Sequence, residues 1–454
     1  MIKNIKAKII KDSRGNPTVE VMLKTDVADF VASVPAGASR GKNEAVALPA
    51  EKAVENINKI IAPKIISKEE YLQKELDNLM IEIDGTENKS KLGANAILAV
   101  SMAICRAGAK ANGLPLYRYI SALSGVRPLA GCDGECSHCS HRLQENCVLP
   151  HPCFNIVNGG AHAKNDLQIQ EFMIIPQEEF FSKNLKIGEI VYKKLKTILK
   201  NKFGGKGIVI ADEGGFSPPI FNDINALDFI VEAIGDCNVK IGLDCAASQF
   251  YFPSPKEAKE NNPSEAQSRW RGSKGGISSR YYGHKSVEPH SDGVYKIDDK
   301  LLDKDGLIEF YGNIIEKYPV ISIEDPFAED DYEGFGMMMK NFGDKIIIVG
   351  DDFLTTNVER IKMAKEKNAC NGAIIKPNQI GTISEAIEAG QLIKSFGWKA
   401  IVSHRSGETM DDFIADLSVG VGADFIKSGA PSRPERLAKY KRLAIIERQL
   451  NNMQ

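Results

Sequence analysis

The chain has 454 residues, and this length predicts two or three domains with sizeable buried cores. Its formal net charge of −2 gives no general electrostatic reason to bind nucleic acid or an anionic membrane. No apolar run reaches membrane-spanning length, and the first residues lack the apolar core of a signal peptide. We therefore expect a cytoplasmic protein with neither a nucleic-acid nor a membrane partner.

The first part of the chain mixes strand and helix patterns. Residues 17–24 alternate apolar and polar side chains, which is typical of a half-buried strand. The segment VPAGASRGKNEAV follows, and its small residues and glycines indicate a surface loop. Residues 92–121 have a helical pattern that is broken near Gly113 and Pro115. We predict an α+β domain over residues 1–127.

Residues 128–150 differ from both flanking regions because they are rich in cysteine and histidine. Cys132, Cys136, Cys139 and Cys147 have the spacing C-x3-C-x2-C-x7-C. Four thiolates suit a small Zn²⁺ knuckle, and an iron–sulfur cluster is a second option. Free thiols in a surface loop are the alternative without a metal. The spacing is not that of a standard zinc ribbon.

From residue 151 onward, short apolar runs alternate with helical stretches such as residues 357–369 and 383–395. This alternation predicts parallel strands joined by crossover helices. Roughly eight such units over residues 151–454 fit a (β/α)₈ barrel better than a doubly wound sheet. Residues 253–292 are rich in Ser, Gly, Pro and charge, so we predict a long insertion of low order there.

Charged residues directly follow or precede many of these apolar runs. In a parallel barrel, active sites form at the carboxyl ends of the strands, so these side chains are expected to converge. A single such acid is as readily explained as a helix cap or an arginine partner. Three acids and two lysines directed into one barrel mouth are better explained by a functional site. Those five are Asp244, Glu324, Asp351, Lys376 and Lys427, and the polar residues Glu171, Glu213, His404 and Arg405 lie near the same strand ends.

The residue types in this set favour one kind of chemistry. Carboxylates from successive strands make an oxygen-rich site that suits Mg²⁺. A divalent cation stabilises the negative charge that develops when a proton leaves a carbon next to a carboxylate. Lys376, with its pKa lowered by cationic neighbours, is the group expected to take that proton. The residues alone therefore predict metal-assisted proton abstraction.

A family resemblance adds detail to this prediction. The motifs DSRGNPTVEV, NGGAHA, QEFM, DEGG, LDCAAS, SIEDP, GDD, IKPNQIG, SHRSGET and IKSGAPSRPERLAKY occur in order across nearly the whole chain, outside the two insertions. In these motifs the chain resembles the enolases, or phosphopyruvate hydratases. The resemblance implies an enolase-type TIM-like barrel and reversible dehydration of 2-phospho-D-glycerate to phosphoenolpyruvate. It also implies a homodimer or higher homo-oligomer.

The resemblance implies a role for each matching residue. Lys376 would remove the C2 proton, while Glu213, supported by Glu171, would protonate the leaving C3 hydroxyl. Lys427 would hold the substrate carboxylate. The full set implied to contact substrate is His162, Glu171, Lys376, His404, Arg405, Ser406 and Lys427. Within it, Arg405 and Ser406 would hold the phosphate, and the two histidines would line the pocket.

The resemblance further implies two Mg²⁺ ions per active site. Asp244, Glu324 and Asp351 would bind the first ion. Ser39, in the loop that would close over the substrate, would help to bind the second.

The chain departs from the enolase pattern in one loop, which reads PAGASRG where the family commonly has PSGASTG. Ala36 and Arg40 are the changed positions, and they bear on loop closure and substrate preference. Two other functions stay open. An enolase scaffold could act as an interaction protein that binds RNA or protein through the two insertions, because residues 253–292 interleave basic and aromatic side chains. An enzyme of the same class could instead use another 2-hydroxy or 2-phospho acid.

Overall fold

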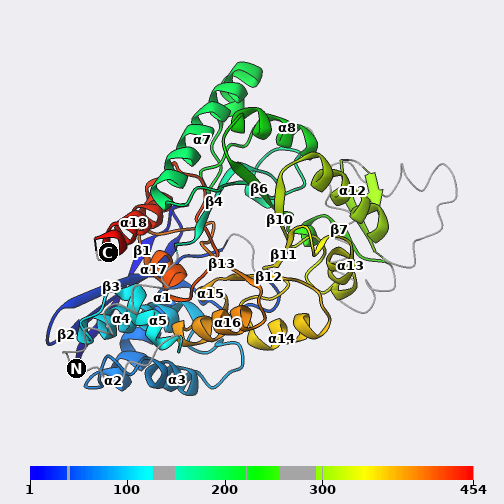
Figure 1. Cartoon of the computed structure of the whole chain (residues 1–454). Coiled ribbons are helices and arrows are strands. Elements are labelled where there is room, and N and C mark those ends of the chain that lie inside the picture. Colours follow the sequence, from blue (N-terminus) through cyan, green and yellow to red (C-terminus); the bar gives the residue numbers. More distant parts are fainter. Residues whose placement is uncertain (38–40, 126–148, 221, 255–292, 299, 453–454) are drawn as a thin grey trace.

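The computed structural model describes most of the chain as two connected parts (Figure 1). Ser39, the four cysteines of the proposed zinc knuckle and nearly all of the insertion at 253–292 lie outside the described residues, so those predictions are not tested. None of the described helices combines the length and the apolar character needed to cross a lipid bilayer. The described ranges are 1–37, 41–125, 149–220, 222–254, 293–298 and 300–452.

The N-terminal part begins with an antiparallel three-stranded sheet, β1 (Ile2–Lys11), β2 (Pro17–Thr25) and β3 (Asp29–Ser33). The alternating pattern of residues 17–24 is confirmed as a strand, because Val19, Val21 and Leu23 are fully buried. Helices cover this buried face. They are α1 (Ala50–Asn56), a π-helical turn (Ile57–Ile61), α2 (Ala62–Ile65), α3 (Gln73–Asp84), α4 (Ala94–Ala111) and α5 (Leu116–Leu123).

Helix α4 is the centre of this part. It consists mainly of alanine and other small or apolar residues, and all but four of its 18 residues are buried. It packs against β2, β3 and α5. The predicted break in the helix is confirmed, because α4 ends before Gly113, which has a positive φ of 63°, and α5 starts after Pro115.

The second part is a closed eight-stranded barrel. Its interior is packed with apolar side chains such as Met173, Val349, Ile374 and Ile401. In order around the barrel, the strands are β10 (Val320–Glu324), β11 (Ile347–Gly350), β12 (Gly372–Ile375), β13 (Lys399–Ser403), β14 (Phe425–Lys427), β4 (His151–Asn158), β5 (Glu171–Pro176) and β6 (Val239–Asp244).

The barrel is confirmed, but the expectation that all its strands are parallel is wrong. Six neighbouring pairs are parallel, whereas β5 is antiparallel to both β4 and β6. The connection between β4 and β5 contains only a short 3₁₀ turn, so the chain reverses as a hairpin without a crossover helix. Two helices, α7 (Phe181–Phe203) and α8 (Asp223–Ile234), lie between β5 and β6. Because these two helices run up and down the barrel wall, β6 starts at the same end of the barrel at which β5 ends.

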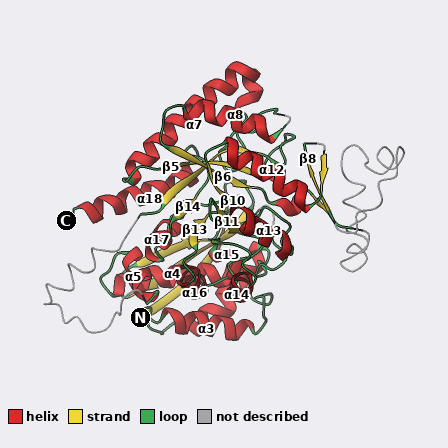
Figure 2. Cartoon of the chain, turned by 45° about the vertical axis from the view of Figure 1, so that its right-hand side comes forward, coloured by secondary structure: helices red, strands yellow, loops and turns green. Residues whose placement is uncertain are grey.

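Helices surround the barrel on the outside (Figure 1). The predicted helices at 357–369 and 383–395 are confirmed as α14 and α16. A small sheet of β7 (Tyr251–Phe252), β8 (Val294–Ile297) and β9 (Lys300–Leu302) projects from one side (Figure 2). The remaining barrel helices are α12 (Lys304–Lys317), α13 (Tyr332–Phe342), α14 (Val358–Glu366), α15 (Pro377–Ile380), α16 (Ile383–Ser395), α17 (Phe413–Gly420) and α18 (Pro434–Asn451).

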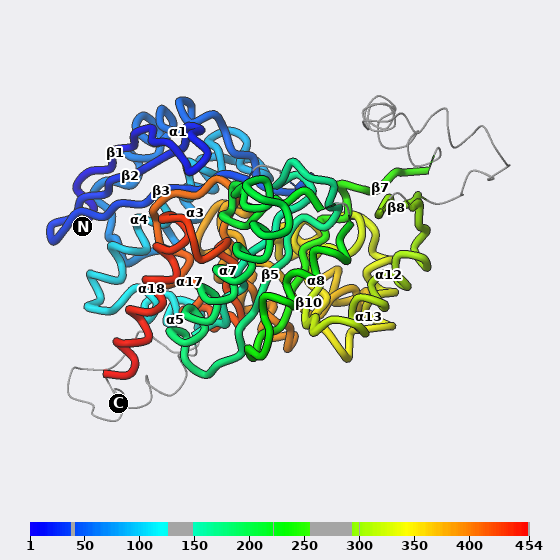
Figure 3. Tube along the Cα trace, turned by 90° about the horizontal axis from the view of Figure 1, so that it is seen from above, coloured from blue at the N-terminus to red at the C-terminus, as the bar shows by residue number. Residues whose placement is uncertain are grey.

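The N-terminal part packs against the barrel (Figure 3), and its backbone bonds to the segments that follow β12 and β13, from Ala45 to Gln379 and from Ala36 to Gly407. Ala36 and Gly407 exchange two backbone hydrogen bonds. Arg106 on α4 pairs with Asp411 at 2.8 Å through both guanidinium Nη atoms. Because these contacts lie at the edge of the barrel mouth, they bring the loop that begins at Val34 next to the strand ends.

Candidate active site

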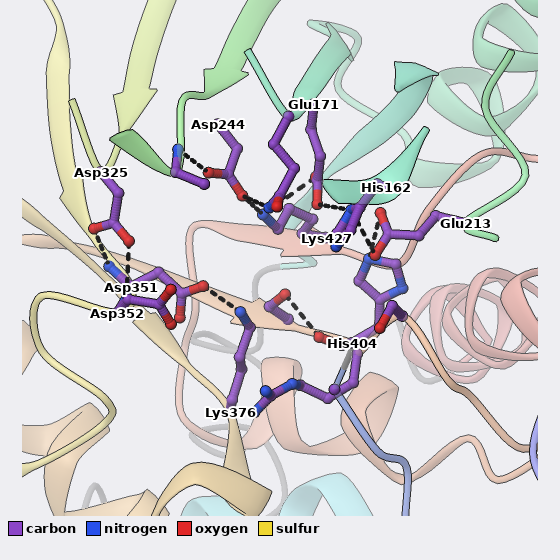
Figure 4. Close-up of a pocket in the computed structure, with 16 residues that line it drawn as sticks. His162, Glu171, Glu213, Asp244, Asp325, Asp351, Asp352, Lys376, His404 and Lys427 are labelled. Carbon is purple, nitrogen blue, oxygen red and sulfur yellow. Dashed lines mark hydrogen bonds and ion pairs between the residues drawn. The ribbon is translucent and has the colours of Figure 1, made fainter. Parts of the chain in front are cut away.

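All but one of the polar residues predicted at the strand ends line one cavity at the barrel mouth (Figure 4), and the exception, Glu324, contacts the cavity residue Lys427. Asp244 and Lys427 are the last residues of β6 and β14, whereas Lys376 and His404 directly follow β12 and β13. Glu171 reaches the same mouth from the first residue of β5, since β5 runs in the opposite direction to its neighbours.

Lys427 lies at the centre of the acidic part of this cavity. Its Nζ is 2.9 Å from Asp244 Oδ2, 2.9 Å from Glu324 Oε1 and 3.2 Å from Glu171 Oε2. Burial opposes its charge, but the three carboxylates outweigh burial and raise the pKa of Lys427 well above its usual value. Lys427 therefore stays protonated and holds together acids from three different strands.

Asp351 has a different lysine partner. Its Oδ2 contacts Lys376 Nζ, and its Oδ1 accepts a hydrogen bond of 3.0 Å from Gln379 Nε2. Burial lowers the pKa of Lys376, as do Arg405 and Lys427, but the Asp351 carboxylate reverses the balance and the pKa is raised. The cationic neighbours act in the predicted direction, but the predicted net lowering of the Lys376 pKa is wrong for this arrangement, because the adjacent acid outweighs them.

Asp325 supports the acidic side and has no lysine partner among the described residues. Its two carboxylate oxygens accept hydrogen bonds from the backbone N–H groups of Asp351 and Asp352, at 2.9 and 2.8 Å. Its own backbone has a positive φ of 43°, an uncommon conformation for a non-glycine residue. Burial and the neighbouring Asp351 raise the pKa of Asp352 to about 7. This cluster therefore concentrates negative charge around the end of β11.

A second cluster lies across the cavity and contains His162, Glu171 and Glu213. His162 Nδ1 is 3.7 Å from Glu171 Oε1 and 3.5 Å from Glu213 Oε1, so the imidazole lies between the two carboxyls. Asn155, inside β4, donates a hydrogen bond of 2.8 Å from Nδ2 to Glu213 Oε2. All of these side chains are almost completely buried, and that of His162 is the most exposed at 7%.

The two carboxyls of this cluster differ in their affinity for a proton. Burial and the neighbouring Glu213 raise the pKa of Glu171 well above its ordinary value. Burial also acts to raise the pKa of Glu213, but His162, His404 and Arg436 outweigh it and bring that pKa well below the ordinary value. Of the two carboxyls, Glu171 therefore binds a proton more tightly than Glu213.

Arg405 and Ser406 extend the cavity from the loop after β13. Arg405 donates to both carboxylate oxygens of Glu44, at 2.9 and 3.0 Å, and to Asn378 Oδ1 at 3.2 Å. Glu44 comes from the N-terminal part, so the two parts of the chain jointly orient this guanidinium. Its planar fork is suited to an anion such as phosphate.

The donor set fits divalent cations. Six carboxylates line the cavity, against the three cationic side chains of Lys376, Arg405 and Lys427. Burial and Asp244 raise the pKa of Glu324 well above its usual value, so additional positive charge beside it would be stabilising. Oxygen-only ligands of this kind suit Mg²⁺. Asp244 and Glu324 share Lys427, whereas Asp351 pairs with Lys376, so lysines occupy the positions between the three predicted ligands.

Comparisons with known proteins agree with this geometry. The family model "Enolase, N-terminal domain" matches residues 2–120, and "Enolase, C-terminal TIM barrel domain" matches residues 146–275 and 273–454. The chain belongs to the enolase family. It is 45% identical to the enolase of Eimeria tenella and 44% identical to that of Mastigamoeba balamuthi, in each case over 99% of this chain and 96% of the relative. Enolase 1 of Entamoeba histolytica is 42% identical over the whole chain and 97% of its own length.

Several residues of this enolase site were not predicted from the sequence. Asn155 is inside a buried strand and had no local signal. Asp325, in the motif SIEDP, could have been noticed because it is next to the predicted ligand Glu324. Arg436 and Gln379 also lie inside matched motifs, but their contacts depend on the fold. Glu44 is 361 residues from its partner Arg405 and could not be paired with it by sequence position.

Ala36, one of the two departures from the enolase pattern, has a simple structural account. Its backbone makes two hydrogen bonds with Gly407, and any non-proline residue can make them. The substitution at this position is therefore compatible with the same loop geometry.

Proposed function

We propose that this chain catalyses the Mg²⁺-dependent, reversible dehydration of 2-phospho-D-glycerate to phosphoenolpyruvate, and is a lyase of glycolysis and gluconeogenesis. One arrangement supports this most directly: Lys376 and the Glu171–Glu213 pair lie on opposite sides of one cavity (Figure 4). A group that takes a proton from one carbon thus faces groups that can protonate a hydroxyl on the next carbon.

The reaction assigns each side of the cavity a separate task. Lys376 Nζ takes the C2 proton, the C2–H electron pair forms the double bond to C3, and the C3–O bond breaks. The departing hydroxyl takes a proton from the Glu171–Glu213 pair and leaves as water. Glu213 is the proposed donor, and Glu171 replenishes it through their shared contact with His162. No electron donor or acceptor is needed.

The remaining residues position the substrate and its charges. Arg405 and Ser406 hold the phosphate, and Lys427 holds the carboxylate. Asp244, Glu324 and Asp351 would hold one Mg²⁺, and Ser39 would contribute to a second. A bound Mg²⁺ would supply positive charge beside the substrate carboxylate while C2 loses its proton, and it would offset the Asp351 charge that raises the pKa of Lys376.

A direct assay tests the proposal. Purified protein with 2-phosphoglycerate and Mg²⁺ should produce the ultraviolet absorbance of phosphoenolpyruvate, and a chelator should abolish the signal. If a non-phosphorylated 2-hydroxy acid were processed faster, the substrate assignment would be wrong. If no 2-hydroxy or 2-phospho acid reacted, the interaction-protein alternative would replace it.

We also propose a cytoplasmic homodimer or larger homo-oligomer, as the family resemblance implies. The outer face of the N-terminal sheet carries Met22 and Val31, which pair across β2 and β3 and are 39% and 42% exposed. We propose this apolar pair as part of a subunit contact. Light scattering coupled to gel filtration measures the molar mass and tests this proposal.

A Zn²⁺ ion bound by Cys132, Cys136, Cys139 and Cys147 is proposed on their spacing alone. Metal analysis of protein purified without added metal, after Mg²⁺ is removed with a weak chelator, tests this site. About one equivalent of zinc would support it, iron would favour the cluster alternative, and neither metal would show that the thiols are free.

A further inference from the structure

Arg436, on α18, is a completely buried arginine at the base of the Glu–His cluster. Its two Nη atoms donate to four acceptors. Nη1 contacts His404 Nδ1 and the Arg405 carbonyl at 2.7 Å, while Nη2 contacts the carbonyls of Asp212, at 3.1 Å, and Ser406. Four Nη hydrogens therefore meet four acceptors, and no Nη hydrogen is left for another arrangement.

This arrangement determines where His404 carries its proton. A guanidinium is always protonated and can only donate, so the imidazole nitrogen that contacts it must be unprotonated. A neutral imidazole with an unprotonated Nδ1 carries its hydrogen on Nε2. The other three acceptors are backbone carbonyl oxygens, which can only accept. Arg436 therefore cannot turn to let His404 Nδ1 donate without losing its hydrogen bonds to these carbonyls.

The other nitrogen of His404 faces the reaction site. His404 Nε2 is 3.7 Å from Glu213 Oε2, and it is a buried atom without a hydrogen-bond partner among the described residues. Its N–H is thus directed into the cavity beside the carboxyl that we propose as the proton donor. A substrate oxygen placed there would receive this hydrogen bond.

We propose that Arg436 is a positioning residue that holds His404 as the neutral Nε2–H tautomer, so that His404 donates a hydrogen bond to the substrate beside Glu213 and takes no part in proton transfer. The use of this hydrogen bond by substrate rests on the function proposed above, but the tautomer itself does not. Arg436 also links the backbone just before Glu213 to the backbone just after His404, through the carbonyls of Asp212 and Ser406.

The surrounding charges agree with a neutral ring. Burial lowers the pKa of His404, Glu213 opposes this, and Arg436, Lys427 and Lys376 lower it further, with the result that it lies well below the ordinary value. Protonation of Nδ1 would place two cations in direct contact in a buried site.

The first test uses the unmodified protein without substrate. Nitrogen-15 NMR of ring-labelled histidines, with His404 assigned by comparison with His404→Gln, should show an unprotonated Nδ1 and a protonated Nε2 that do not change between about pH 6 and 8, on either side of the ordinary imidazole pKa of about 6.5. A protonated Nδ1, or a doubly protonated ring in this interval, would overturn the proposal. This result is independent of dehydratase activity.

The second test removes the guanidinium group of Arg436. In Arg436→Gln, His404 should show both tautomers, and its pKa should be higher than in the unmodified protein, because one of the cations that lower it is gone. The turnover number should fall by roughly 10- to 100-fold, the range typical when a residue that orients a functional histidine is lost. KM should change much less, and the pH profile should gain an ionisation that the unmodified protein lacks.

Arg442→Gln is the matched control. Arg442 lies on the same helix and makes a two-pronged ion pair with Asp416, at 2.7 and 2.6 Å, away from the cavity. It should lose stability without any change in His404. If Arg436→Gln kept the Nε2–H tautomer and lost no more activity than this control, the proposal would be wrong. If Arg436→Gln did not fold, the spectrum of the unmodified protein alone would decide.

Discussion

The two sides of the barrel mouth are held in different ways. On the acid side, formed by Asp244, Glu324 and Asp351, the partners are the ammonium groups of two lysines. On the Glu–His side, formed by His162, Glu171, Glu213 and His404, the partners include Asn155 in a barrel strand and Arg436, whose fork is tied to three backbone carbonyls.

This difference means that the lysine partners on the acid side can be replaced by a cation, whereas the arginine on the Glu–His side must stay in place. A lysine ammonium is a compact charge on a flexible stem, so a bound cation can take over its role beside a carboxylate without disturbing the backbone. The guanidinium of Arg436 cannot move without leaving buried carbonyls unsatisfied. The acid side is therefore suited to binding metal, and the Glu–His side to holding protons at defined atoms.

The largest expected effect comes from Lys376, which bridges the acid side and the reaction. Lys376→Met should lower the turnover number by at least ~10²- to 10⁴-fold, because the group that takes the proton is lost. Steady-state kinetics with 2-phosphoglycerate measure this. Lys399→Met is the control, since Lys399 is a half-exposed lysine that pairs with Asp424 outside the cavity. Near-normal activity of Lys376→Met would refute the role of the lysine.

The next effect tests whether the acid side is the metal site. Mg²⁺ at a hundred times its dissociation constant should stabilise the protein by about 2.7 kcal/mol, and a chelator should remove this gain. In Asp244→Asn the gain should be much smaller, because one ligand charge is lost. Unfolding followed with and without Mg²⁺ measures it. Asp303→Asn, at the N-terminus of α12, should behave like the unmodified protein, and an equal Mg²⁺ effect in Asp244→Asn would exclude this ligand.

A smaller, pH-dependent effect concerns the support behind the Glu–His side. Asp223 accepts hydrogen bonds from the backbone of Gln168 and Ile169, in the hairpin that carries His162 and Glu171. Burial and Asp298 raise the pKa of Asp223 from 3.8 to about 7. The folded state thus binds this proton more tightly than the unfolded state does.

The raised pKa of Asp223 determines how the free energy of unfolding changes with pH. The stabilisation from the protonated carboxyl is complete below about pH 3.8 and is lost as the pH rises to about 7. Within this window, the unmodified protein should lose up to about 1.4 kcal/mol per pH unit relative to Asp223→Asn, whose side chain does not ionise. Urea unfolding of both proteins at pH 5 and pH 6 measures the difference. A constant difference would contradict the raised pKa.

The smallest effect is expected at Ala36, which is next to the site but belongs to neither side. Ala36→Ser restores the residue that is common in the family, and it leaves the backbone pairing with Gly407 intact. The free energy of unfolding should change by less than about 0.5 kcal/mol. The kcat/KM should stay within a factor of about two. A larger kinetic change would show that this side chain affects the loop that begins at Val34.

Much of the site could be predicted because strand ends are local features. Asp244, Glu324 and Asp351 each come at the end of a short apolar run, and closure of the sheet brings such ends together. Glu171 was included in the set, but the reason for its position was not predicted. It starts a strand that runs backwards, and only the hairpin between β4 and β5 explains why its side chain faces the mouth.

The sequence by itself determined the order of the elements, the residue types at the strand ends and the membership of the enolase family. Tertiary structure alone decided which charges are neighbours. Asp351 against Lys376 reverses the expected direction of one pKa, and Arg436 against His404 determines one tautomer. The physical reason is that proton affinities in a buried site depend on distances of a few ångströms between residues far apart in the chain, and no local pattern carries that information.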